Sequence, residues 1–198
     1  MKKLCDTILR DLEEGRQLVL VTVCQRQGSA PRGAGASMLV YPDGTQLGTV
    51  GGGAVEYAAA KEAMGLFDTR GSRSCTYRLN ANEIAEAGMI CGGIVRVLLM
   101  YLEASEANKA FFRGLIAARD GGAAAALVRS LQDGAVTGMG YWDGKTLHGL
   151  SAVLPHTGAH AYLTEDGGLL YEPVSLGDRA IVFGGGHVVL PLLQASVV

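Results

Sequence analysis

Hydrophobic residues in the first third of the chain follow two different spacings. Apolar positions recur every three or four residues near the N-terminus, which is typical of an amphipathic helix, and a β-branched run follows, which is typical of a buried strand. A proline-aspartate-glycine turn then separates two further strand-like runs. The pattern predicts a helix over 2–15, strands over 18–23, 37–41 and 45–50, and an alanine-rich helix over 54–67.

The middle of the chain also contains both strand-like and helix-like patterns. The run at 94–101 is the clearest strand of the sequence, and an amphipathic helix follows it. The pattern predicts strands over 74–79, 94–101, 124–131, 136–141 and 146–150, helices over 82–87 and 105–119, and loops or a weak hairpin over 155–168. We therefore expect an α/β (mixed α+β) domain with a mixed sheet over residues 1–178.

The last residues of the chain have a different sequence pattern from those before them. Residues 179–188 have the order of strand, glycine turn and helix start, with which a dinucleotide-binding unit begins. However, Val189 replaces the third glycine of the fingerprint, Pro191 would interrupt the helix, and the residues that follow are too few for a second strand. We therefore expect residues 179–198 to be an incomplete, Rossmann-like strand–turn–helix fragment.

Composition narrows the range of functions. The 198 residues carry a net charge of −2 and are 48% hydrophobic, which indicates a folded core and gives no reason to expect nucleic acid or a membrane as partner. The four cysteines show no paired C-x-x-C spacing, which argues against a zinc site, and no apolar run reaches transmembrane length. We expect a cytoplasmic protein with free thiols.

Two glycine-dense turns are the main candidates for a binding site. The first runs from Gly28 to Gly35 and the second from Gly48 to Glu56, and each can expose several backbone N–H groups to an anionic ligand. Arg32 could add a bidentate contact to a phosphate, although the first segment could equally be a plain tight turn. Glu56 could contact a ligand or simply occupy the first turn of a helix. The candidate binding residues in these turns are Gly28, Ser29, Arg32, Gly51, Gly52, Gly53 and Glu56.

A third glycine pair follows a thiol, at Cys91-Gly92-Gly93. Free cysteine is often a small buried hydrophobe, but a turn that leads into a strand favours partial exposure of Cys91. A thiolate is a nucleophile and a soft ligand, so Cys91 could also contact a ligand. We expect the other three cysteines to be packing residues.

Taken together, these segments resemble the XdhC/CoxI family, whose members are accessory factors of xanthine dehydrogenase and related molybdenum hydroxylases. The resemblance rests on five segments in order along the chain: 28–32, 38–40, 48–56, 91–93 and 183–188. Family members usually carry a complete Rossmann-like domain after the N-terminal domain. Some also have a cysteine after the second glycine turn, where this chain has Ala54, so Cys91 is the only thiol within a family motif.

The resemblance implies a cytoplasmic chaperone that binds molybdenum cofactor (molybdopterin) transiently. Such a protein assists sulfuration of the cofactor and its insertion into a xanthine dehydrogenase-like apo-enzyme, and a cysteine desulfurase is a further candidate partner. Cofactor-binding roles fall on the turn residues above and on Cys91, Gly92 and Gly93, with Cys91 as the candidate molybdenum contact. No residue is assigned a catalytic role.

Other interpretations remain open on the residues alone. A cysteine-dependent sulfur transferase would turn over persulfide donors through Cys91, and a nucleotide-dependent oxidoreductase would need the half of a dinucleotide fold that the sequence does not contain. A third alternative is an interaction module without a ligand. The apolar residues 188–198 would be exposed in a monomer, which predicts a homodimer that buries them.

Overall fold

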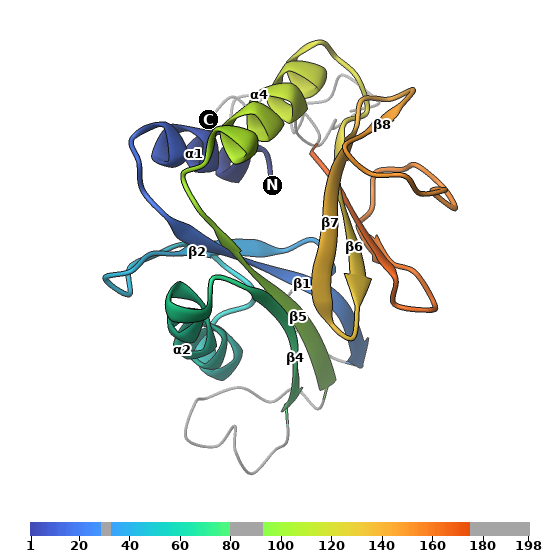
Figure 1. The fold of residues 1–198 in the computed structure, drawn as a ribbon. Helices are drawn as coiled ribbons and strands as arrows, with labels where there is room; N and C mark the ends of the chain where they lie inside the picture. The colour runs from blue at the N-terminus through green and yellow to red at the C-terminus, as the bar shows by residue number, and fades with distance from the viewer. Residues whose placement is uncertain (29–32, 80–92, 175–198) are drawn as a thin grey trace, which may run out of the picture.

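Two five-stranded sheets form the framework of the protein. The computed structural model describes residues 1–28, 33–79 and 93–174 (Figure 1). Sheet A has the strand order β3 (Gln46–Gly48), β2 (Ser37–Val40), β1 (Leu18–Gly28), β5 (Gly93–Leu102) and β4 (Ser72–Leu79). Sheet B has the order β8 (Leu147–His148), β7 (Ala135–Trp142), β6 (Ala126–Gln132), β10 (Leu169–Pro173) and β9 (Tyr162–Leu163).

All strand pairs in the described part of the chain are antiparallel. The expected mixture of α and β elements is thus confirmed, but the expectation of a mixed sheet is wrong. The physical reason is connectivity. Strand neighbours such as β2–β3, β6–β7 and β9–β10 are joined by short turns, and a short turn can only reverse the direction of the chain.

Three helices of the described residues cover the two faces of sheet A. α2 (Gly53–Thr69) packs on one face, whereas α1 (Lys2–Glu13), α4 (Glu106–Asp120) and sheet B lie on the other (Figure 1). Because side chains alternate across a strand, β1 serves both layers. Val19 and Val21 pack in the α2 layer, while Leu18 and Leu20 pack with α1, α4 and sheet B.

Local sequence explains where the helices begin and how they are fixed. The side chain of Ser105 accepts a hydrogen bond from the backbone N–H of Asn108, which caps α4. Arg119 near the end of α4 is almost buried and forms a 2.8 Å ion pair with Asp6 of α1. This contact ties the two helices that share one face of sheet A. None of the helices in the described ranges is long and apolar enough to span a membrane.

Most predicted elements of the described residues are confirmed, and one strand was missed. The hydrophobic pattern predicts no strand at 169–173, yet β10 lies in the interior of sheet B. This segment contains Glu172 and ends at Pro173, and neither residue is usual in a central strand. The predicted helix over 82–87 and the Rossmann-like fragment over 179–198 lie outside the described residues, so the boundary at 178 stays a prediction.

Candidate functional site

The three glycine-rich segments leave strands of sheet A in the same direction, but at two different levels. Gly28, the last residue of β1, pairs with Gly93, the first residue of β5, and Gly93 also pairs with Leu79 at the end of β4. β3 runs in the same direction as β1, because both are antiparallel to β2, but Gly48 is level with Val21 of β1, seven residues before Gly28. We call the first of these levels the glycine end of sheet A, defined by Gly28, Leu79 and Gly93.

Four predicted site residues lie outside the described part of the chain. These are Ser29, Arg32, Cys91 and Gly92. Their chain neighbours on the described side, Gly28 and Gly93, are adjacent in the sheet. The roles predicted for Arg32 and Cys91 therefore stay predictions, and both segments leave the sheet at its glycine end.

The second glycine turn holds the carboxylate of Glu56. Oε2 of Glu56 accepts hydrogen bonds from the hydroxyl of Thr49 at 2.6 Å, from the backbone N–H of Val50 at 3.2 Å and from that of Gly52 at 3.0 Å. The N–H groups of the turn thus point at one carboxylate oxygen at the start of α2, and the predicted binding of a ligand by this turn stays a prediction. In this structure the oxygen belongs to the protein itself, so an anionic ligand would compete with Glu56 for these N–H groups.

The backbone of this turn depends on glycine. Gly51 has φ 133° and Gly52 has φ 75°, values that side-chain-bearing residues rarely adopt. This left-handed path points the N–H groups of Val50 and Gly52 at the carboxylate of Glu56 just before α2 begins at Gly53, while the N–H of Gly51 donates to the hydroxyl of Thr49. The partial positive charge of the helix N-terminus adds to the attraction for Glu56.

A polar groove of about 800 Å³ separates the two sheets near the glycine end. On the face of sheet A that looks toward sheet B, Leu98 of β5 lies in an apolar cluster with Cys24, but the next residue along this face is Arg96, paired with Gln25 and Thr76. The register of β1 shifts by one residue between Val23 and Gln25, which is a bulge of the kind that re-aims side chains. The groove is lined by Gln25, Arg26, Gln27, Ser74, Thr76, Ile94, Arg96, Leu131, Gln132, Asp133, Gly134, Asp166, Gly167 and Gly168.

The three described thiols behave as packing residues, as expected. Burial raises the pKa of Cys5 to about 12 and that of Cys24 to about 11, and it also raises the pKa of the half-buried Cys75. A thiol with a raised pKa stays protonated at neutral pH and is a poor nucleophile. Cys91, the predicted functional thiol, lies outside the described residues.

A buried ion pair behind the first glycine turn was not predicted from the sequence. Arg129 of β6 donates to Glu172 of β10, and the hydroxyl of Ser37 lies within hydrogen-bond distance of Glu172, at 3.3 Å, and of the carbonyl of Gly35, at 3.1 Å. Glu172 also lines a pocket of about 330 Å³ together with Gly33, Gly35 and His160. The available signal was a charged residue within each of two apolar runs, 126–131 and 169–173.

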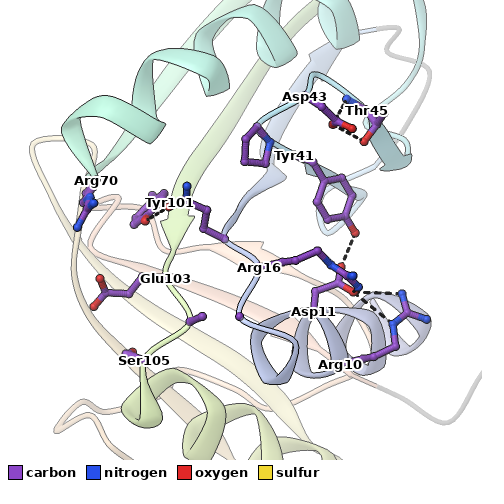
Figure 2. Close-up of a pocket in the computed structure, with 14 residues that line it drawn as sticks. Arg10, Asp11, Arg16, Tyr41, Asp43, Thr45, Arg70, Tyr101, Glu103 and Ser105 are labelled. Carbon is purple, nitrogen blue, oxygen red and sulfur yellow. Dashed lines mark hydrogen bonds and ion pairs between the residues drawn. The ribbon is translucent and has the colours of Figure 1, made fainter.

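A cavity of about 860 Å³ lies at the opposite end of sheet A (Figure 2). Its charges are largely matched internally, since the enclosed carboxylate of Asp11 accepts hydrogen bonds from Arg10, Arg16 and Tyr41. Burial alone would raise the pKa of Asp11, but these three donors outweigh burial and hold it below the ordinary value of 3.8. Because this cavity is remote from the glycine turns, we do not assign the predicted ligand to it.

Metal coordination by side chains has no support in the described ranges, where no three His, Cys, Asp or Glu residues gather as ligands. The candidate molybdenum contact, Cys91, is outside those ranges.

Comparison with known proteins points to the same family. Residues 11–79 match the model of the XdhC and CoxI family. The resemblance inferred from the sequence is thus confirmed over the stretch that contains both glycine turns and α2. The chain is also similar to the molybdenum cofactor insertion chaperone PaoD of Escherichia coli (strain K12), with 36% identity over 104 residues, which cover 50% of this chain and 32% of that protein.

The chain is also similar to a further curated protein and, in its fold, to a solved structure. A protein of Bacillus subtilis (strain 168) that is named as a probable subunit of xanthine dehydrogenase is 37% identical over 94 residues, covering 46% of this chain and 28% of that protein. The crystal structure of a xanthine dehydrogenase from Bacillus halodurans superposes with a TM-score of 0.67 at 24% identity, covering 97% of this chain and 59% of that chain. The latter establishes a shared fold. The matches span about a third of the length of the curated relatives.

Proposed function

We propose that this chain binds molybdenum cofactor as a transient cargo and assists its insertion into a xanthine dehydrogenase-type apo-enzyme. The observation that carries the proposal is the similarity to an insertion chaperone, together with the family match over 11–79. That stretch contains β1, both glycine turns and α2.

Two features of the described residues support a non-covalent binding role. Molybdopterin is anionic, and the second glycine turn binds a carboxylate oxygen through two backbone N–H groups and a hydroxyl. Separately, the groove of about 800 Å³ beside the glycine end falls within the usual size of small-molecule sites. Arg32 and Cys91 belong to segments that leave the sheet at this end, and we assign them to the phosphate and to the metal.

Release of the cargo favours contacts that can be reversed. Hydrogen bonds and ion pairs at the surface of a groove allow transfer to an apo-enzyme, whereas a buried covalent link would oppose it. Sulfuration of the cofactor with a cysteine desulfurase as donor, a cytoplasmic location and a homodimeric state are further parts of this proposal. The raised pKa values of Cys5 and Cys24 leave Cys91 as our candidate for contact with sulfur or molybdenum.

The proposal is tested by measuring the cargo directly. The protein is purified from a host that makes molybdenum cofactor, and molybdenum and oxidised pterin are quantified per chain for wild type, Arg32→Ala and Cys91→Ala. Arg70→Ala is the control, because Arg70 lines the cavity at the opposite end of sheet A. We expect pterin in wild type and in the control, and a loss in both site variants.

Insertion is tested by mixing the loaded protein with a cofactor-free xanthine dehydrogenase-type enzyme. Gain of enzyme activity that scales with the pterin content of the added protein would support transfer. Wild-type protein that contains no pterin, or loaded protein that fails to activate the enzyme, would contradict the proposal.

A further inference from the structure

The groove between the sheets has a feature that packing does not explain. Along the face of sheet A that looks toward sheet B, the apolar positions Leu20 and Met100 pair with each other, and Leu98 follows on the same strand. The next position on this face of β5 is Arg96, a cation on a strand in the interior of the sheet. A half-buried guanidinium at such a position costs desolvation energy, so it normally has an acidic partner.

Arg96 has no such partner in the described part of the chain. No described residue forms an ion pair or hydrogen bond with its guanidinium, and its strand neighbours are the neutral Gln25 and Thr76. Two acids also line the groove. Asp133 is exposed in the turn between β6 and β7. Asp166 is engaged within its own loop, where its carboxylate accepts hydrogen bonds from the hydroxyl of Thr164 at 2.6 Å and from the N–H of Gly168 at 2.9 Å. These hydrogen bonds hold the pKa of Asp166 below its ordinary value.

A glycine loop of sheet B lies close to the guanidinium of Arg96 in the wall of the groove. Nη1 of Arg96 lies 3.8 Å from the point at which a Cβ on Gly167 would stand. Gly167 and Gly168 bear no side chain, so the guanidinium faces a groove wall made of backbone. Gln25 and Thr76 flank it with amide and hydroxyl groups that can donate to further oxygens.

We propose that Arg96 anchors the phosphate monoester of a pterin ligand in this groove. This assignment rests on the proposed function for the identity of the natural ligand, and it adds a residue that no glycine motif contains. A guanidinium matches two phosphate oxygens at once, and such charge-assisted pairs are stronger than neutral hydrogen bonds. The neutral floor around Arg96 leaves its charge available for a ligand.

Direct binding measurements on the full chain test the assignment. Fluorescence titration compares neopterin monophosphate with neopterin, which has the same ring without the phosphate. We expect the phosphorylated pterin to bind more tightly, and Arg96→Gln to weaken it by roughly tenfold or more while affecting neopterin little. Arg96→Lys keeps the charge without the bidentate geometry, so its affinity should fall between those of wild type and Arg96→Gln.

Arg73→Gln serves as the matched control. Arg73 lies on the neighbouring strand β4 and forms an exposed ion pair with Glu62 of α2, away from the groove. Its substitution should leave the affinity for neopterin monophosphate unchanged. Thermal unfolding of each variant shows whether it is folded. Equal affinity of wild type for both pterins, or an unchanged affinity in a folded Arg96→Gln variant, would overturn the assignment.

A competition experiment distinguishes a phosphate ester from free phosphate. If inorganic phosphate displaced neopterin monophosphate at equal concentration, the groove would be a site for free phosphate, and the ester assignment would be wrong. Displacement only at a large excess supports the ester. Failure of the proposed function would give a different experimental result. Purified wild type would then lack molybdopterin, while binding of neopterin monophosphate would still depend on Arg96.

Discussion

Arg129 of β6 and Glu172 of β10 form an ion pair that is enclosed between the two sheets. The exposed fractions of their side chains are 0% and 1%. Thr22 and Ser37 of sheet A complete the cluster, since Arg129 donates to the hydroxyl of Thr22 at 3.1 Å and Ser37 donates to Glu172. Burial lowers the pKa of Arg129 to about 10, so the guanidinium stays charged at neutral pH. The polar cluster links sheet B to the strand that follows the first glycine turn.

Removal of one partner of this pair should destabilise the fold strongly. Arg129→Met leaves the carboxylate of Glu172 buried without a counter-ion, for which we expect a loss of about 3–5 kcal/mol in the free energy of unfolding. The double variant Arg129→Met with Glu172→Leu replaces the pair by apolar groups and should recover much of that loss. Urea denaturation of the single and double variants measures the coupling. A double variant less stable than Arg129→Met would contradict this account.

Glu56 should stabilise the second glycine turn through its three hydrogen bonds. Glu56→Ala leaves the N–H groups of Val50 and Gly52 without their acceptor, and we expect a loss of about 1–2 kcal/mol in the free energy of unfolding. Glu62→Ala on the same helix is the control, because it removes only an exposed ion pair, worth about 0–1 kcal/mol. Urea denaturation should rank the two variants in this order, and equal losses would show that the turn does not depend on Glu56.

The acid stability of the protein should depend on Asp11. Its folded-state pKa is lowered, so the stability that it contributes is fully present above its ordinary pKa of 3.8 and is lost as the pH falls through the folded-state value. Asp11→Asn should therefore be less stable than wild type at pH 7, and the difference should shrink below pH 3.8. Unfolding free energies across this pH range test the prediction. Asp68→Asn, at an exposed position on α2, should show no comparable effect, and a difference for Asp11→Asn that persisted at the lowest pH would contradict the assignment.

Local patterns in the sequence predict most of the described helices and strands, because hydrophobic periodicity and turn residues determine them. The β-branched run at 18–23 predicts a buried strand, and β1 is covered on both faces, with Val19 in one layer and Leu20 in the other. β10 was not predicted because a glutamate is unusual in a central strand. Glu172 is accommodated there because it pairs with Arg129, which is 43 positions away along the chain. No local pattern encodes that pairing.

The candidate site, like the fold, could be predicted from the sequence only in part. Glycine content predicts an anion-binding turn. In the structure the N–H group of Gly52 in that turn donates to a carboxylate of the protein itself, and binding of a ligand there stays a prediction. The sequence alone does not decide that this carboxylate is Glu56. Arg96 was not predicted as a binding residue because its proposed role depends on its surroundings. Its neighbours on the adjacent strands are uncharged, and a glycine loop of sheet B lies close to its guanidinium. Such a juxtaposition depends on tertiary structure.

The entry into the second glycine turn gives a last test, in which two glycines with similar backbones are compared. Gly48 has φ 93° and Gly52 has φ 75°, so a side chain at either position is strained by about 1–3 kcal/mol. At Gly48 a Cβ would also lie 2.6 Å from the carbonyl oxygen of Ser37, whereas at Gly52 it would meet nothing within 4 Å. Gly48→Ala should therefore lower the free energy of unfolding clearly more than Gly52→Ala does. Urea denaturation of both variants measures the difference, and equal losses would mean that β3 and β2 do not approach as closely at this point as the structure shows.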